Sequence, residues 1–162
     1  KSWLMVLASR VENQAFLRAC LQDAKYIDAT KNIVATYNQK LDACKLRFGN
    51  LTKSGTGNLS AEQKAGLKAL IEQEVIPDLQ SRQKELDAVE VPAGARYLAD
   101  QREQATNLTL ESWNHFLKGL ETDDPDEFSQ AETLNKQELA VDLRVDDIIR
   151  HTAVSRNIPN LP

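Results

Sequence analysis

Residues 16–48 read FLRACLQDAKYIDATKNIVATYNQKLDACKLRF, and this stretch decides the fold. Apolar and small residues recur in it at steps of three and four, which return to one face of an α-helix. Such a face must be buried against other helices. The stretch therefore predicts one long helix whose buried stripe is Phe16, Cys20, Asp23, Ile27, Thr30, Val34, Tyr37, Leu41, Cys44 and Phe48.

A surface loop and a second helix are predicted after this stretch. The segment 49–59, GNLTKSGTGNL, has the Gly, Ser, Thr and Asn content of a loop. Ser60 followed by Gln63 is a capping box, so the second helix begins there and runs to about residue 90. Pro77 lacks the amide proton that a helical turn needs, and we expect a bend or break near Ile76.

Two more helices complete the predicted fold. Pro92 suits the first turn of a third helix that ends near residue 122, and Asp124 caps a fourth that stops before Pro159. The connections at 91–93 and 122–125 are short, so neighbouring helices run antiparallel. We predict one all-α domain over residues 1–162: an antiparallel up-down-up-down four-helix bundle with an extra N-terminal helical segment.

Residues 1–15 have no counterpart of equal height in the other helices. They must overhang the bundle or fold back across it, and these alternatives stay open. The stripe Leu4, Leu7, Val11 and Gln14 is also out of phase with the stripe from Phe16 onward. A helix break within 22–30 is therefore an alternative to one continuous helix.

An apolar surface within this segment is the candidate partner contact. Compact apolar surfaces on a soluble protein often mark interaction sites. We expect this one to contact another protein chain, a second copy of the protein or a membrane surface. Its residues are Trp3, Leu4, Met5, Val6 and Leu7.

Cys20 and Cys44 are the two cysteines, and the predicted helix keeps them apart. On one continuous helix they lie roughly 36 Å from each other, whereas a disulfide needs Cα atoms within about 7 Å. We expect both to be free and buried as small apolar residues of the stripe. A hairpin turning at 23–28 would not pair them either, because it would set Cys20 beside about Asn32.

The two histidines give no metal site by sequence. His115 and His151 each follow a carboxylate by four residues, Glu111 and Asp147, which predicts ordinary pairs on a helix surface. The antiparallel turn near Asp124 separates the two histidines by roughly 27 Å in height, too far to share one ion. We expect no redox metal and no cofactor. No catalytic residues are assigned, because no nucleophile, phosphate-loop or dinucleotide motif occurs.

An acidic turn is the remaining candidate for a cation. It crowds five carboxylates, which capping and helix-dipole complementation explain better than calcium does. In an alternating bundle it lies at the same end as the 49–59 loop, and that end is the better place for a polar ligand. The turn consists of Glu121, Asp123, Asp124, Asp126 and Glu127.

Charge and composition narrow the function class. The net charge of −4, with Lys and Arg scattered among acids, argues against nucleic-acid binding. The start without Met and the polar surface rich in Asn, Gln, Ser and Thr lead us to expect an extracytoplasmic location: periplasmic, cell-surface or secreted. Sequons at Asn50 and Asn58 fall in the predicted loop and are candidate glycosylation sites, while a third at Asn107 falls on a helix.

The function predicted from these observations is a non-enzymatic helical binding or assembly module. The alternative is a small-ligand or cofactor carrier whose site lies inside the bundle. Polar residues on the predicted buried faces motivate this alternative, because buried polar groups need partners. They are Asp23, Thr30, Arg82, Gln101 and Glu138.

Overall fold

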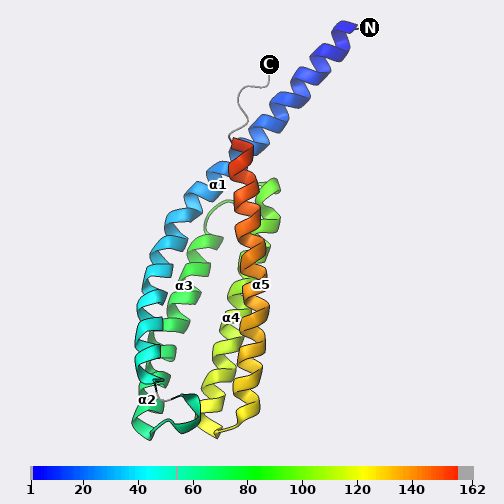
Figure 1. Cartoon of the computed structure of the whole chain (residues 1–162). Coiled ribbons are helices and arrows are strands. Elements are labelled where there is room, and N and C mark those ends of the chain that lie inside the picture. The colour runs from blue at the N-terminus through cyan, green and yellow to red at the C-terminus, as the bar shows by residue number, and fades with distance from the viewer. Residues whose placement is uncertain (1, 54, 157–162) are drawn as a thin grey trace.

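The structure is a computed structural model that describes residues 2–53 and 55–156 (Figure 1). It is an all-α antiparallel bundle of four rods, and the described residues contain no strand. The fold class predicted from the sequence is confirmed. The rods are α1 (Ser2–Leu51), a second rod made of α2 (Ala61–Leu70), the π-helical turn η2 (Ile71–Val75) and α3 (Ile76–Asp87), then α4 (Arg96–Thr122) and α5 (Pro125–Arg156).

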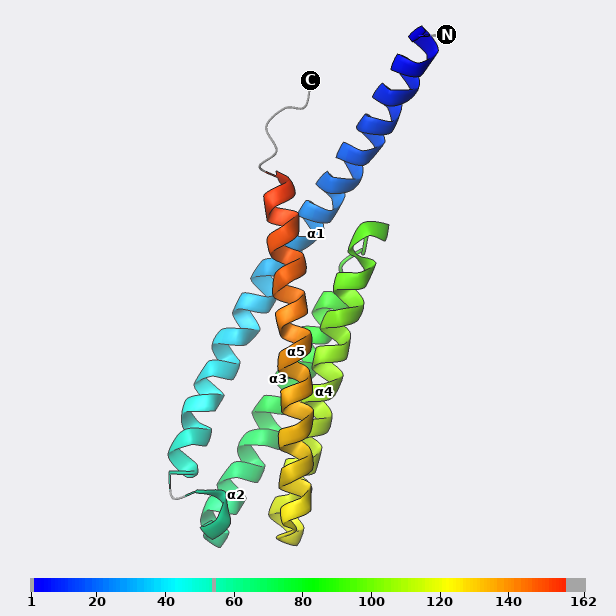
Figure 2. The same cartoon turned by 45° about the vertical axis from the view of Figure 1, so that its right-hand side comes forward.

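The rods run alternately between two ends of the bundle. At the loop end, α1 connects to α2 through the 3-10 turn η1 (Thr56–Asn58), and α4 connects to α5. At the termini end, α3 connects to α4 through the 3-10 turn η3 (Ala93–Ala95), α1 enters the bundle and α5 finishes (Figures 1 and 2). The acidic turn and the loop after α1 thus share one end, as expected.

The first rod is one unbroken helix of 50 residues. The alternative of a break within 22–30 is wrong, and so is the alternative in which residues 1–15 fold back. Every side chain from Trp3 to Ala19 is exposed, and Cys20 is the first that is half-buried. We call residues 2–19 of α1 the arm, which projects beyond the termini end by about 27 Å at 1.5 Å per residue (Figure 2). Because α1 continues to Leu51, the loop begins three residues later than position 49.

The second rod begins as predicted and is interrupted near its proline. Ser60 Oγ accepts from Gln63 N at 3.1 Å, and Gln63 Oε1 accepts from Ser60 N at 2.8 Å, which is the predicted capping box. The interruption is the π-helical turn, in which the Ile76 N–H reaches back five residues to the Ile71 carbonyl. Pro77 has no N–H to donate in the next turn. The wider π-helical turn accommodates the missing hydrogen bond without breaking the rod. The rod ends at Asp87 rather than near residue 90.

The third rod begins later than predicted, and the fourth begins as predicted. Pro92 is extended, with ψ of 156°, and precedes η3, so α4 starts at Arg96. α4 ends on Asp123 in the left-handed conformation, with φ of 55°. Asp124 Oδ1 then accepts from Asp126 N at 2.9 Å and caps α5.

The core has a closed part and an open part. From Cys20 to Phe48, every residue of the predicted α1 stripe is buried or half-buried, which confirms it, whereas Phe16 lies on the arm and is exposed. At the termini end, Ile27 of α1 packs in one cluster with Val145 of α5, so the core is closed between α1 and α5 there. Toward the loop end, the clusters join α1, the second rod and α4, and α5 reaches them through Phe128 alone. The helices α1 and α5 therefore diverge toward the loop end.

Candidate functional site

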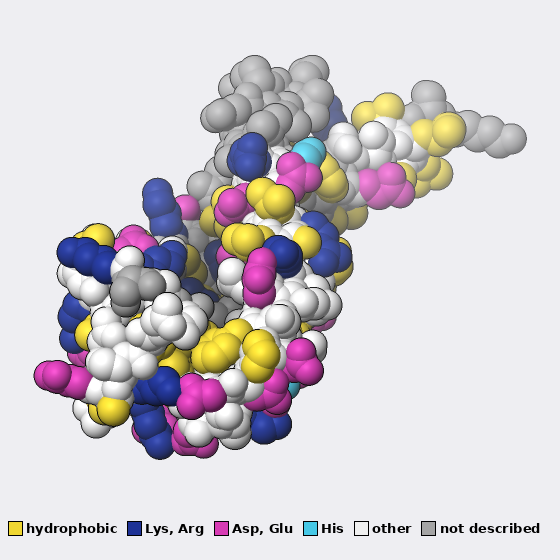
Figure 3. Space-filling view, turned by 60° about the horizontal axis from the view of Figure 1, so that its bottom comes forward, with side chains coloured by type: hydrophobic (Ala, Val, Ile, Leu, Met, Phe, Trp, Pro, Cys, Tyr) yellow, Lys and Arg dark blue, Asp and Glu magenta, His cyan; other side chains and the backbone are white. Residues whose placement is uncertain are grey.

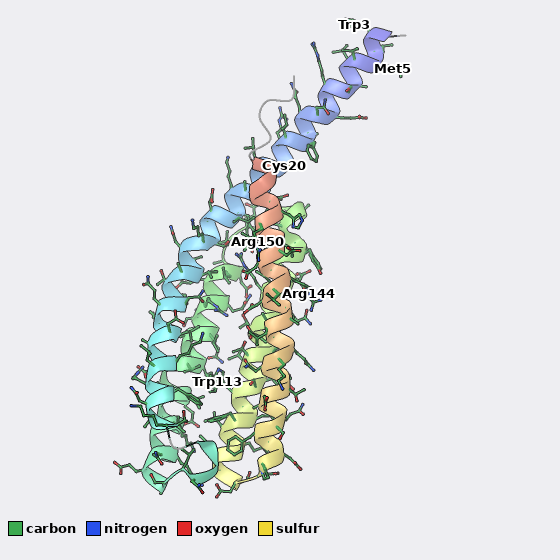
Figure 4. All side chains as sticks on the ribbon, in the orientation of Figure 1. Trp3, Met5, Cys20, Trp113, Arg144 and Arg150 are labelled. Atoms are coloured by element: carbon green, nitrogen blue, oxygen red, sulfur yellow. The ribbon has the colours of Figure 1, made fainter. Side chains whose placement is uncertain are left out.

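The arm exposes the apolar side chains singled out from the sequence. Trp3 and Met5 lie far beyond the bundle, whereas Cys20 lies where α1 meets the end of α5 (Figure 4). Hydrophobic side chains cover much of the visible arm surface, with few charged ones between them (Figure 3). No residue of the described chain outside the arm covers them. Their exposed fractions are Trp3 73%, Leu4 71%, Met5 74%, Val6 50% and Leu7 38%.

A groove of about 840 Å³ opens where α1 and α5 diverge. All four rods line it, so its floor reaches the middle of the bundle. Along α5 it extends from Phe128 to Asp142, about 21 Å of helix. Its volume falls within the range of roughly 300–1,000 Å³ typical of small-molecule sites. Hydrophobic side chains are visible at the surface of the loop end of the molecule, among charged ones (Figure 3).

The half of the groove nearer the loop end is aromatic. Phe48 of α1 contacts Trp113 and Phe116 of α4, with ring centroids 5.6 and 5.3 Å apart, and Phe116 contacts Phe128 of α5 at 5.2 Å. Gly119 allows this last approach, because a Cβ there would lie 2.9 Å from the Phe128 ring. The four rings form an apolar wall for the groove.

The other half of the groove is polar and charged. Arg82 of α3 donates from Nη1 to Asn38 Oδ1 of α1 at 3.3 Å, and burial lowers the pKa of its guanidinium. Glu138 and Asp142 lie one turn apart on α5 and hydrogen-bond to each other. Burial and this neighbouring carboxylate raise the pKa of Glu138 to about 8, although Arg82 and Lys45 favour its charged form. Groups shifted this far often mark functional sites.

The other polar residues of the predicted buried faces lie outside the groove. Thr30 is completely buried and accepts from Arg102 Nη1 at 2.9 Å. Gln101 is also buried, and its Oε1 has no hydrogen-bond partner. Asp23 is half-buried against Gly94, and burial raises the pKa of its carboxyl group. Of the five residues, the structure thus brings only Arg82 and Glu138 together.

Cations of the protein itself engage the acidic turn. Lys64 of α2 forms an ion pair with Asp123, and Lys68 Nζ lies 2.9 Å from Glu121 Oε1. These pairs join the second rod to the end of α4. In the described part of the chain, no three His, Cys, Asp or Glu side chains converge on a metal-sized site. The absence of a redox metal stays a prediction.

The histidines differ from each other. His115 Nδ1 lies 2.5 Å from Glu127 Oε2 on α5, so its partner is across the helix pair and the predicted pairing with Glu111 is wrong. Lys118 binds the same carboxylate at 2.5 Å, and the hydrogen bonds from Lys118 and His115 lower the pKa of Glu127. His151 Nδ1 lies 2.7 Å from the Asp147 carbonyl oxygen and 3.9 Å from its Oδ1, as the i,i+4 prediction requires.

The cysteines and sequons follow most of the sequence predictions. Both cysteines are free, which confirms that they do not bond to each other. Cys44 is buried, but Cys20 is only half-buried because it lies where the bundle ends and the arm begins. Asn58 is exposed in η1, as a loop sequon should be, whereas Asn50 is exposed in the last turn of α1 and not in the loop.

The sequence missed most of the groove. Trp113 and Asp142 carry its aromatic wall and its carboxylate pair, and neither was singled out. One signal was present: Glu138 and Asp142 are acids four residues apart, which is unfavourable on a helix unless something offsets the repulsion.

None of the described helices has a stretch long and apolar enough to cross a membrane. Comparison with protein-family models, curated proteins and solved structures finds no match to this chain.

Proposed function

We propose that the protein is a non-enzymatic assembly module whose arm packs against the arm of a second copy. One observation carries the proposal: the arm is an unbroken continuation of α1, yet its apolar stripe faces away from the bundle. The arm stripe is out of phase with the stripe that is buried in the bundle. Because both lie on one continuous helix, they face different directions.

The arm stripe has the spacing of a coiled coil. Its positions alternate in steps of three and four, which keep one seam facing a partner helix. At 3.6 residues per turn, this seam lies roughly 170° around the helix from the stripe that Cys20, Asp23, Ile27 and Thr30 bury in the bundle. The protein's own core therefore cannot cover the seam, which consists of Leu4, Leu7, Val11, Gln14, Arg18 and Leu21.

The seam covers the arm and ends just beyond it, at Leu21. The next positions of the same repeat along α1 are all exposed and, apart from Ala35, polar: Lys25, Asp28, Asn32, Ala35 and Gln39. A partner is therefore expected at the arm only and not along the bundle. Two arms of this length offer only a short contact, toward the low end for specific interfaces, so we expect reversible dimers.

A second copy fits this surface better than other occupants do. A seam with a 3-4 repeat is self-complementary, and its polar layers at Gln14 and Arg18 fix register and orientation, as polar core positions do in coiled coils.

We place the module outside the cytoplasm, supported by the polar surface and by the exposed sequon at Asn58.

Sedimentation velocity across a concentration series tests the proposal. The double variant Leu7→Glu/Val11→Glu should be monomeric where the wild type forms dimers, with an unchanged melting temperature because these side chains touch nothing in the bundle. The control Ser9→Glu/Asn13→Glu adds the same charge on the opposite side of the arm and should keep the dimer. A wild type that stays monomeric and instead co-sediments with lipid vesicles would refute self-assembly in favour of a membrane surface.

A further inference from the structure

No part of the described chain fills the groove between α1 and α5. It is open along one side, closed at the termini end by the packing of Ile27 against Val145, and lined by all four rods. It lies in the bundle and not on the arm. An inference about its ligand is therefore independent of the proposed assembly, and each can fail without the other.

The dimensions of the groove suit a small elongated molecule. The groove follows α5 for about 21 Å. A single alkyl chain or a similarly narrow apolar body can lie along it. The ring wall formed by Phe48, Trp113, Phe116 and Phe128 supplies the apolar contact that such a body needs.

The charges of the groove select the other end of the ligand. Asp42 is paired with Lys45 at 3.5 Å, and Glu132 is paired with Lys136 at 2.8 Å. The remaining charged residues of the lining are Arg82, Glu138 and Asp142, so two carboxylates face one guanidinium. When both acids are ionised, this end is short of one positive charge.

We propose that the groove binds an elongated amphiphile with a single cationic head. Its apolar body lies along the aromatic wall, and its ammonium group lies beside Glu138 and Asp142. The cation supplies the charge that this pair lacks, and the partly buried site makes the interaction stronger than it would be in water. An anionic head would meet two carboxylates at the same place once Glu138 is ionised.

Proton binding makes the affinity depend on pH. The groups that face Glu138 are Asp142 on its own helix, Arg82 on α3, and Lys45 with its partner Asp42 on α1; the α4 lining contributes no charge. Because Glu138 titrates with a pKa of about 8, it is largely protonated at pH 6 and ionised at pH 9. A ligand with a permanent positive charge should therefore bind more tightly at pH 9.

Fluorescence of Trp113 tests the proposal on the full-length chain. The chain has two tryptophans, so Trp3→Phe leaves Trp113, which lines the groove, as the only emitter. The probes are decyltrimethylammonium, decanoate and the neutral decyl maltoside, each titrated below its micelle concentration. We expect saturable binding of the ammonium probe about tenfold tighter than that of decanoate, the ratio that 1.4 kcal/mol gives.

Charge variants separate the groove from the general acidity of the protein. Glu138→Gln/Asp142→Asn should abolish the preference for the cation and its pH dependence. Asp146→Asn, an exposed acid of α5 outside the lining, should leave both unchanged. Equal affinity for the three probes, tighter binding of decanoate, or no saturable change in Trp113 emission would overturn the proposal. So would a preference for the cation that survives the double variant.

Discussion

Replacing Glu138 by Gln should stabilise the protein in alkaline solution and not in acid. The native structure raises the pKa of this carboxyl group from 4.5 to about 8, so the folded state holds a proton that the unfolded state has lost between these values. Stability therefore falls as pH rises from about 4.5 to about 8, and the loss is complete above pH 8. Gln keeps the shape and the hydrogen-bonding capacity of the protonated acid and removes the titration.

The full shift corresponds to about 5 kcal/mol, which is an upper bound. Glu138 is only half-buried, so solvent screening and relaxation reduce the expected gain of Glu138→Gln to about 1–2 kcal/mol at pH 9, or about 2–8 °C in melting temperature. Urea unfolding followed by circular dichroism at pH 5 and pH 9 measures it. Glu132→Gln is the control, because Lys136 lowers the pKa of Glu132 and no alkaline gain is expected there. A Glu138→Gln variant no more stable than wild type at pH 9 would refute the reasoning.

Two further predictions concern packing and a buried hydrogen bond. Gly119→Ala should cost about 1–3 kcal/mol in urea unfolding, because the new Cβ overlaps the Phe128 ring. At Gly66 the nearest atom lies 3.4 Å from an added Cβ, so Gly66→Ala should be neutral or gain up to about 1 kcal/mol; equal costs at the two sites would contradict the close approach of α5. Thr30→Val should cost about 1–3 kcal/mol, since the half-buried Arg102 loses its acceptor, whereas Thr36→Val, which breaks only an exposed intrahelical bond, should stay within about 0.5 kcal/mol.

The rods were predictable because their signals are local. The 3-4 periodicity of residues 20–48 identified the buried face of α1, and Ser60 with Gln63 identified the start of α2. The same periodicity revealed the phase change near residue 16. It left a break and a continuous helix as alternatives, because periodicity reports faces and not continuity.

Long-range partners were not predictable. His115 was assigned to Glu111 because sequence spacing reports neighbours on one helix, whereas its partner Glu127 lies across the hairpin. The groove depends on how α1 and α5 diverge, which is a matter of packing between rods: Phe128 packs α5 against α4 at Gly119, and Ile27 packs with Val145 at the termini end. The π-helical turn is intermediate: Pro77 predicted an interruption, but the surrounding packing decided that it would be a widened turn.

Hydrogen exchange of the arm amides at two protein concentrations tests the central claim most directly. An arm that touches nothing is a solvated helical end, and such ends fray and exchange fast. If arms pair, amides of residues 4–18 should gain protection as the concentration rises from below to above the dimer dissociation constant, while amides of the bundle stay unchanged. Fast exchange of the arm at both concentrations would contradict the account.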